Sequence, residues 1–244
     1  MSFDKPRNTI DELSDLRAQA PTRQALGSTA RFFDGELPLM PGVTIPMRSM
    51  LVETAGTKIL ISPIGTQEES RAIGRGLTSV CAPSLLHHKF VQPVLERLQP
   101  RDLWGPPGYG DKLPEFERAK LFGRDEWPYY DVLDFAVVYG APARNEVVFF
   151  HKSSRTLYTA DLVFNISEPK GFLTPLTFRA MGIHKRFAVA RMWKRWVEDK
   201  VAFRASIDRI FEWDFDRIVM AHGDIVPTNG RARLEAALRE RDLF

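Results

Sequence analysis

Asp161 is the residue of this chain whose surroundings most require a chemical partner. It follows the strand-like run Thr156–Thr159 and directly precedes the apolar run 162–164. An ionised carboxylate among apolar groups is costly to desolvate. A metal ion, the guanidinium of Arg155 or a set of backbone N–H groups could offset that cost.

Histidines at the ends of predicted elements are candidate partners for that carboxylate. His87 and His88 lie between a short apolar strand and a predicted helix, so both rings could face one ion, or one could cap the helix while the other packs. His222 ends a short apolar strand directly before Gly223, a residue that leaves the backbone free to approach a ligand. It could equally be a core histidine that Asp224 holds by a hydrogen bond.

His151 and Arg155 lie in the polar turn of a predicted hairpin. Surroundings of this kind indicate solvation, which favours a substrate contact or a turn residue over a metal ligand. The single cysteine, Cys81, lies in an apolar strand, where cysteine usually acts as a small hydrophobic residue. One cysteine excludes an internal disulfide and predicts a reducing compartment.

Hairpins and short β–α units must position these side chains. The strand pairs are Ser49–Val52 with Lys58–Ile61, and Val147–Phe150 with Thr156–Thr159. Each candidate ligand lies where a strand ends, the usual place for sites in α/β proteins. Strands mixed with helices in this order predict an α/β fold of two sheets between helical layers. The spacing of apolar residues also predicts one long helix over Phe187–Trp213.

The composition is that of an ordinary soluble globular protein. The chain has 244 residues, 44% of them hydrophobic and 27% charged, with a formal charge of +3. Basic residues between 185 and 204 alternate with acidic ones on the polar side of the predicted helix, so no nucleic-acid binding is expected. Without an apolar run of membrane-spanning length or a secretory signal, we expect no membrane association and a cytoplasmic location.

Residues 1–30 are polar and lack periodicity, so they are predicted to form an arm outside a single domain of residues 31–244. The large apolar residues of the predicted long helix exceed what one buried stripe needs. The excess could be core, or it could be the face of a homodimer.

The order of these motifs resembles the metallo-β-lactamase superfamily, and more closely a divergent, largely uncharacterised branch of it. The resemblance spans about residues 40–244, and the segments that carry it are Met47–Val52, Pro83–His88, Trp-Gly-Pro-Pro-Gly at 104–108, His-Lys-Ser-Ser-Arg-Thr-Leu at 151–157 and Ala-His-Gly at 221–223. It implies a four-layer αββα sandwich.

The chain departs from that family at the first of its two metal positions. Members typically carry a His-x-His-x-Asp-His run, which is aligned here with His88 as its last histidine. Pro83 and Leu85 then replace two histidines, and His87 replaces the aspartate. The histidine of the third motif would fall near Pro142. All three imidazoles of the first position are therefore missing.

The second metal position is retained, and the resemblance implies one divalent metal ion there. Its ligands would be His88, Asp161 and His222, with His87 as a fourth. Zn²⁺ is the expected ion, with Fe or Mn as alternatives.

Two functions follow from this reading. In the first, the protein is a metal-dependent hydrolase of an unknown small-molecule substrate. His87 and Asp161 are then the catalytic residues, with His87 as general base if it is free of the ion, and His151 and Arg155 contact the substrate. In the second, no metal is bound and the fold persists without catalysis. The cleft would then bind a small anion or a protein partner through His151, Arg155 and the other histidines.

Overall fold

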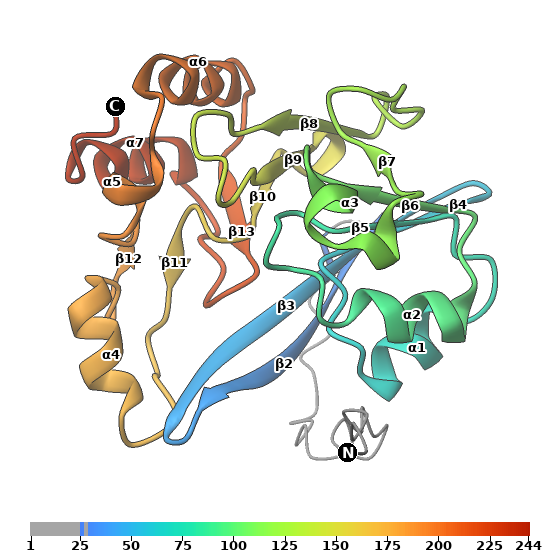
Figure 1. The fold of residues 1–244 in the computed structure, drawn as a ribbon, viewed down its shortest axis with the longest axis horizontal. Coiled ribbons are helices and arrows are strands. Elements are labelled where there is room, and N and C mark those ends of the chain that lie inside the picture. Colours follow the sequence, from blue (N-terminus) through green and yellow to red (C-terminus); the bar gives the residue numbers. More distant parts are fainter. Residues whose placement is uncertain (1–24, 27–28) are drawn as a thin grey trace, which may run out of the picture.

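The computed structural model describes residues 25–26 and 29–244, whose strands form sheets of seven, four and two strands (Figure 1). The seven-stranded sheet contains, in spatial order, β1 (Ala25–Leu26), β2 (Ala30–Met40), β3 (Val43–Thr54), β4 (Thr57–Ile61), β5 (Ser79–Cys81), β6 (Asp102–Gly105) and β7 (Lys120–Leu121). The four-stranded sheet contains β13 (Arg217–Met220), β10 (Thr156–Thr159), β9 (Val147–His151) and β8 (Leu133–Val137). The small sheet pairs β11 (Phe164–Asn165) with β12 (Phe187–Ala188).

Helices cover the outer faces of the two larger sheets (Figure 1). On the side of the seven-stranded sheet lie α1 (Gln67–Ile73), α2 (Val91–Leu98) and α3 (Tyr109–Lys112). On the side of the four-stranded sheet lie α5 (Trp193–Trp196), α6 (Lys200–Phe211) and α7 (Gly230–Arg239). α4 (Thr174–Met181) lies at the end of the β2–β3 hairpin, where Thr44 N donates to Thr174 Oγ1 at 3.0 Å (Figure 1). Two short 3₁₀ turns, Pro114–Phe116 and Lys152–Ser154, complete the described elements.

The alternation of side chains along the strands accounts for this layering. In β9, Val147 and Phe149 pack in the core between the sheets, whereas Val148 and Phe150 pack against the helices. Successive residues of a strand point to opposite faces, so an unbroken apolar strand must be covered on both sides. The predicted α/β class and four-layer αββα sandwich are confirmed.

The direction of the strands brings several loops to one edge of the molecule. β4, β5, β6 and β7 are parallel to one another, and β10 is parallel to β13. The segments that follow β5, β10 and β13 all carry candidate ligands. Strand direction in both sheets therefore decides where the site assembles.

The predicted long helix over Phe187–Trp213 is wrong. Its first residues form β12, which pairs with β11, and the rest divides into α5 and α6. Asp199 accounts for the division, because its side chain accepts hydrogen bonds from Val201 N and Ala202 N and so begins a new helix.

The sheet begins inside the region predicted to be an arm. β1 and Ala30 both precede residue 31, and Ala30 is only 1% exposed. Residues 1–24 and 27–28 of that predicted arm lie outside the described residues. No helix within the described ranges is both long and apolar enough to cross a lipid bilayer.

Candidate metal centre

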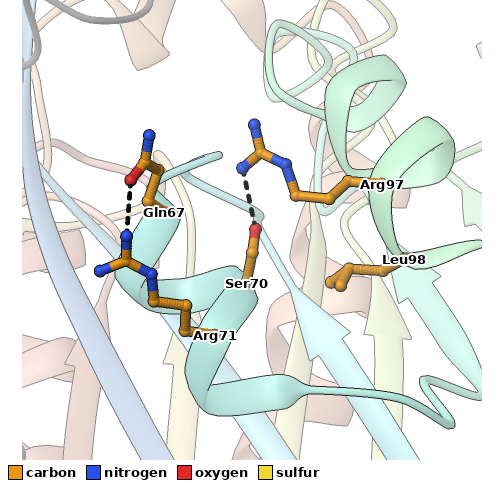
Figure 2. A pocket seen from close by; sticks show the side chains of 5 residues that line it. All are labelled: Gln67, Ser70, Arg71, Arg97 and Leu98. Carbon is orange, nitrogen blue, oxygen red and sulfur yellow. Dashed lines mark hydrogen bonds between the residues drawn. The ribbon is translucent and has the colours of Figure 1, made fainter.

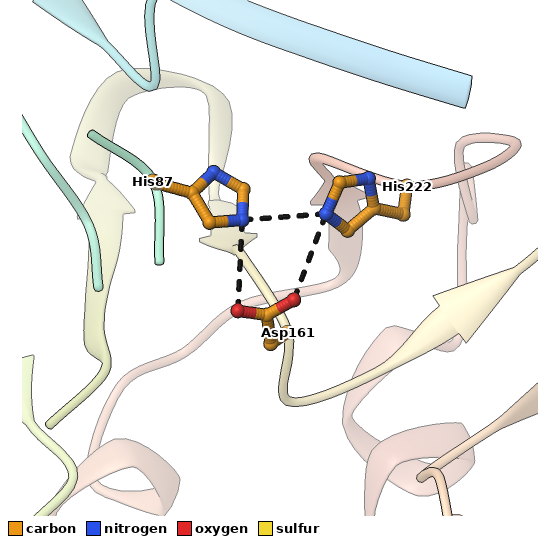
Figure 3. A group of neighbouring side chains, drawn as sticks. All are labelled: His87, Asp161 and His222. Carbon is orange, nitrogen blue, oxygen red and sulfur yellow. Dashed lines mark hydrogen bonds and ion pairs between the residues drawn. The ribbon is translucent and has the colours of Figure 1, made fainter. Parts of the chain in front are cut away.

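Three of the candidate side chains converge (Figure 3). The Nε2 atoms of His87 and His222 are 3.3 Å apart, and each lies 3.6 Å from a different carboxylate oxygen of Asp161. The three side chains are nearly buried, with 9%, 8% and 12% of the side chain exposed for His87, His222 and Asp161. One potential ligand atom from each lies within 4.8 Å of the others.

Strand geometry places these three residues together. Asp161 and His222 each stand two residues beyond the end of a strand, and these strands, β10 and β13, are parallel neighbours with Thr159 beside Met220. His87 comes from the other sheet, in the turn between β5 and α2, where its N–H donates to Ser84 O at 3.2 Å.

The hydrogen bonds of His222 fix its tautomer. Its Nδ1 lies 2.8 Å from the carbonyl oxygen of Pro46 in β3. A carbonyl oxygen only accepts, so Nδ1 must carry the proton and donate. In the neutral ring, Nε2 then presents a lone pair to Asp161 and His87.

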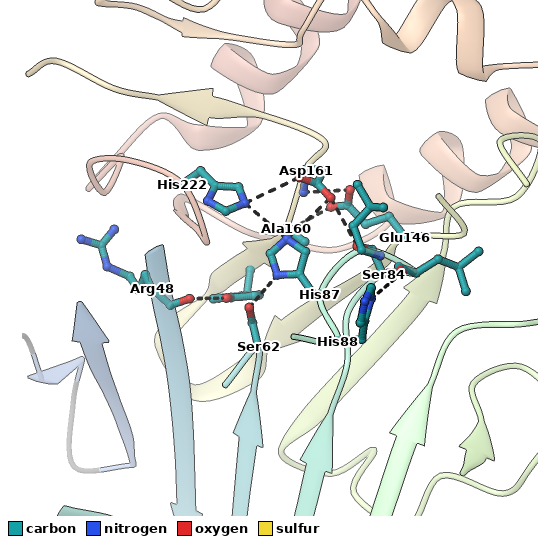
Figure 4. Close-up of polar contacts among 12 residues, drawn as sticks. Arg48, Ser62, Ser84, His87, His88, Glu146, Ala160, Asp161 and His222 are labelled. Carbon is teal, nitrogen blue, oxygen red and sulfur yellow. Dashed lines mark hydrogen bonds and ion pairs between the residues drawn. The ribbon is translucent and has the colours of Figure 1, made fainter. Parts of the chain in front are cut away.

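The Nδ1 atom of His87 is also held by a hydrogen bond (Figure 4). It lies 2.8 Å from Ser62 Oγ, a hydroxyl that can donate or accept. Nε2 is therefore the nitrogen of His87 that faces the group.

The group is therefore rich in potential ligand atoms. The Nε2 atoms of two imidazoles face one carboxylate, and the neutral His222 ring presents a lone pair there. A cation among these atoms, either a proton on a ring or a metal ion, would offset the charge of the carboxylate. Burial by itself raises the pKa of Asp161, but the two imidazoles outweigh it and hold that pKa well below its usual range.

The backbone around Asp161 is held by buried groups. The carboxylate of Glu146 accepts from Ala160 N at 2.8 Å and from Asp161 N at 3.0 Å, and Trp193 Nε1 donates to Asp161 O at 2.9 Å. Ser84 Oγ donates to Asp161 Oδ2 at 3.3 Å. Burial first, and then the negative charge of Asp161, raise the pKa of Glu146.

Ser62 and Glu146 belong to the site but were not predicted from the sequence. Ser62 has no motif to mark it, and its backbone φ of 53° appears only in the structure. Glu146 did carry a signal in the sequence, because it is an acidic residue at the start of the apolar run 147–150. In the structure it is 0% exposed. A buried carboxylate of this kind requires donors, here the backbone N–H groups of Ala160 and Asp161.

Comparison with known proteins identifies the fold. By sequence, the chain matches no protein-family model and no curated protein. By structure, it is similar to a metallo-β-lactamase from Erythrobacter litoralis, with a TM-score of 0.62 and 14% identity over 92% of this chain and 99% of that chain. DIM-1 metallo-β-lactamase gives a TM-score of 0.61 and 11% identity over 91% and 96% of the two chains. The chain has the metallo-β-lactamase fold.

As a metallo-β-lactamase-fold protein it is divergent. A fragment described as a diflavin flavoprotein, from Nostoc sp., is similar at a TM-score of 0.60 and 14% identity over 91% of this chain and 96% of that one. The fold is thus shared by proteins whose names indicate different chemistry, and it does not select a reaction for this chain. The reaction must be argued from the side chains.

His88, which the resemblance includes among the metal ligands, does not lie in the group. Its Nδ1 faces Leu85 O at 3.1 Å, and Figure 4 shows its ring apart from His87, Asp161 and His222. The two adjacent histidines thus point to different surroundings. Of the four predicted ligands, three lie together in the structure: His87, Asp161 and His222.

His151 and Arg155 also lie apart from the group. His151 ends β9 and Arg155 directly precedes β10, whereas Asp161 follows the other end of β10. The expectation of a solvated His151 is wrong, because its side chain is 0% exposed and its pKa is lowered by burial. Arg155 pairs with Asp214 at 2.6 Å and not with Asp161. Their predicted role as substrate contacts therefore has no support from their positions.

A surface cavity of about 400 Å³ lies elsewhere, between α1 and α2 (Figure 2). It is lined by Gln67, Ser70, Arg71, Arg97 and Leu98. The lining includes no histidine and no carboxylate, so this cavity does not contribute to the metal centre.

Proposed function

We propose that this protein binds one divalent metal ion, in the first place Zn²⁺, through His87, Asp161 and His222, and that it is a hydrolase. The observation that carries the proposal is the convergence of two imidazole Nε2 atoms on one carboxylate in a nearly buried position. Imidazole nitrogen and carboxylate oxygen are ordinary ligands of Zn²⁺, and of Fe or Mn as alternatives.

The number of ligands favours a catalytic site over a structural one. Structural zinc sites usually have four protein ligands, whereas catalytic sites have three and leave one position for water or substrate. With His88 turned away, three protein ligands remain. A divalent ion held there would supply Lewis acidity, which polarises a substrate oxygen or makes water more acidic.

His87 and Asp161 are the proposed catalytic residues. Ser62 occupies Nδ1 of His87, so only Nε2 is available, and it can ligate the ion or accept a proton but not both at once. Asp161 directs one oxygen to each imidazole, and Ser84 donates to the oxygen on the His87 side. Asp161 can therefore hold both rings in place while it ligates.

Metal content tests the proposal directly. Protein purified without a metal-affinity tag, incubated with Zn²⁺ and freed of excess ion, should retain about one equivalent by elemental analysis. His87→Ala, Asp161→Asn and His222→Ala should each lose it. His88→Ala is the matched control, because it removes the adjacent imidazole, which lies outside the group, and it should keep the metal.

Retention of the metal in the His87 or His222 variant would contradict the assignment. If wild-type protein retains no zinc, iron or manganese, the hydrolase proposal fails. The protein would then be a non-catalytic relative that binds a ligand or partner in the same cleft. If zinc is retained, hydrolysis of esters, lactones and phosphodiesters should be screened for activity that His222→Ala abolishes.

A further inference from the structure

Arg144, in the loop between β8 and β9, is a half-buried cation without a polar partner. Its Nε is buried with no acceptor, and its guanidinium forms no hydrogen bond or ion pair with any residue that the structure describes. The guanidinium carbon lies over the ring of Trp196, 3.4 Å from the ring centre.

Arg144 stands next to the candidate metal centre. Its carbonyl accepts from Leu85 N at 3.0 Å, in the segment that leads to His87. Trp196, on which it stacks, lies in edge contact with Trp193 at 5.6 Å, and Trp193 donates to the carbonyl of Asp161. Burial lowers the pKa of Arg144, whereas the charges of Asp161 and Glu146 act to raise it, which places both carboxylates within electrostatic reach.

Another arginine of this chain shows what burial normally requires. Arg241, with 10% of its side chain exposed, pairs with Glu240 and donates to the carbonyl oxygens of Val189 and Gly182. A guanidinium is always charged and carries five N–H donors, so leaving it half-buried without an acceptor is costly. Arg144 is therefore arranged for an acceptor that is not part of the described chain.

The orientation of Arg144 indicates the chemistry of that acceptor. Stacking on Trp196 holds the plane of the guanidinium and leaves its edge as the hydrogen-bonding side. That edge is a fork of parallel N–H donors, which matches the two oxygens of a carboxylate or phosphoryl group. A neutral ligand would leave the charge uncompensated.

We propose that Arg144 binds an oxyanion, a carboxylate or phosphoryl group, beside the metal ligands, so that the substrate of this site is anionic. The term substrate rests on the proposed hydrolase function; the oxyanion site itself does not. Arg144 is a binding residue here and fixes the position of the anion relative to Asp161 and His87.

Calorimetric titration with inorganic phosphate and with acetate tests this proposal. Both anions are titrated into the metal-free and the zinc-incubated full-length protein. Arg144→Gln should weaken binding of the preferred anion at least tenfold, the rough effect of losing a charge-assisted hydrogen-bonded pair. Arg144→Lys keeps the positive charge but lacks the parallel N–H donors of a guanidinium. Its affinity for the anion should therefore lie between those of the wild type and Arg144→Gln. Tighter binding of phosphate assigns a phosphoryl group, and tighter binding of acetate a carboxylate.

Arg204→Gln is the matched control, because Arg204 also stacks on an aromatic ring, that of Phe244 at 4.1 Å, but lies on the exposed side of α6. It should bind anions as the wild type does. Equal affinity of wild type and Arg144→Gln, with unchanged thermal unfolding, would overturn the proposal, as would the absence of anion binding by the wild type.

The metal-free titration separates the two proposals. If zinc does not bind but phosphate or acetate binding still depends on Arg144, the hydrolase proposal fails and the oxyanion site stands. If zinc binds with the expected stoichiometry and anion binding does not depend on Arg144, the oxyanion site fails and the hydrolase proposal stands.

Discussion

The imidazoles of the proposed metal centre are oriented by groups that carry no charge. Pro46 contributes only a backbone carbonyl to His222, and Ser62 contributes a hydroxyl to His87. Partners of this kind set which ring nitrogen is protonated and raise the basicity of the other. The ability of these two rings to hold a cation therefore depends on residues outside the ligand set.

The unusual backbone conformation of Ser62 is supported by the contacts of the loop that follows it. Its φ of 53° lies in a region that residues other than glycine and asparagine seldom adopt. The next residues of the loop are tied down by Glu69 of α1, whose carboxylate accepts from Ile64 N at 3.2 Å and from Gly65 N at 2.9 Å. Thr66 caps the same helix by accepting from Glu69 N at 3.1 Å.

Replacement of Glu69 should change how stability depends on pH. Burial raises the pKa of Glu69 from 4.5 to about 7. As the pH rises, the Glu69 carboxyl group loses its proton near pH 4.5 in the unfolded chain and only near pH 7 in the folded chain. Protonated Glu69 therefore contributes its full stability below pH 4.5, and this contribution is lost as the pH rises towards 7. Relative to Glu69→Gln, the wild type should lose roughly 3 kcal/mol of unfolding free energy across this window, measured by urea denaturation.

Glu68→Gln is the control for this experiment, since Glu68 is the adjacent residue and is partly exposed. That variant should follow the wild-type profile. A wild type and a Glu69→Gln variant whose unfolding free energies change in parallel from pH 4.5 to 7 would show that Glu69 does not titrate there.

Among the elements, the loop after β13 is held by close backbone packing and by an arginine of the other sheet. Gly223, next to His222, has a φ of 125°, and a Cβ there would lie 2.2 Å from Asn165 O. Arg48 of β3 donates to the carbonyl of Gly223 and pairs with Asp34 of β2 at 2.6 Å. The two long strands of the first sheet thus hold a loop of the second.

Gly223→Ala should therefore damage both stability and metal binding. The clash involves backbone atoms that cannot move aside, so we expect a loss of roughly 2–4 kcal/mol in unfolding free energy. Displacement of His222 should lower zinc affinity by about 10–100-fold, measured by competition with a chromophoric chelator.

Gly56→Ala is the matched control, because Gly56 also has a positive φ, of 79°, but has no atom within 4 Å of a Cβ position. It should cost only about 1–2 kcal/mol for the left-handed backbone and leave zinc affinity unchanged. Equal zinc affinities of the two glycine variants and the wild type would show that the loop does not position His222.

Across the whole molecule, the proposed metal ion would connect the two sheets. His87 follows a strand of the seven-stranded sheet, whereas Asp161 and His222 follow strands of the four-stranded sheet. The apolar core between the sheets, which includes Met50, Phe149 and other large side chains, also joins them. An ion bound at their common edge stabilises only the folded chain.

Zinc should therefore raise the melting temperature. At free zinc about 100 times Kd the gain is about 2.7 kcal/mol, which corresponds to roughly 5–10 °C for a chain of this size. Differential scanning calorimetry with zinc and with excess chelator measures it. His88→Ala should show the same increase and His222→Ala none; an increase of equal size in both would place the ion elsewhere.

The sequence by itself was sufficient for two hairpins and for the positions of two candidate ligands at strand ends. The hairpins around 49–61 and 147–159 could be read from apolar runs, because such strands must be covered on both faces. Asp161 and His222 could be placed at strand ends for the same reason. Their adjacency follows from the parallel pairing of β10 and β13, which local pattern does not specify.

Tertiary structure decided the remaining features. The spacing of apolar residues could not show that residues 187–213 do not form one helix. The pairing of β12 with β11 and the helix cap at Asp199 interrupt it. Sequence adjacency could not separate His87 from His88, since the turn before α2 turns one ring to the group and the other to Leu85 O. Long-range contacts set the ring orientations and left Arg144 without an acceptor, because side chains take their partners from whichever strands the fold brings beside them.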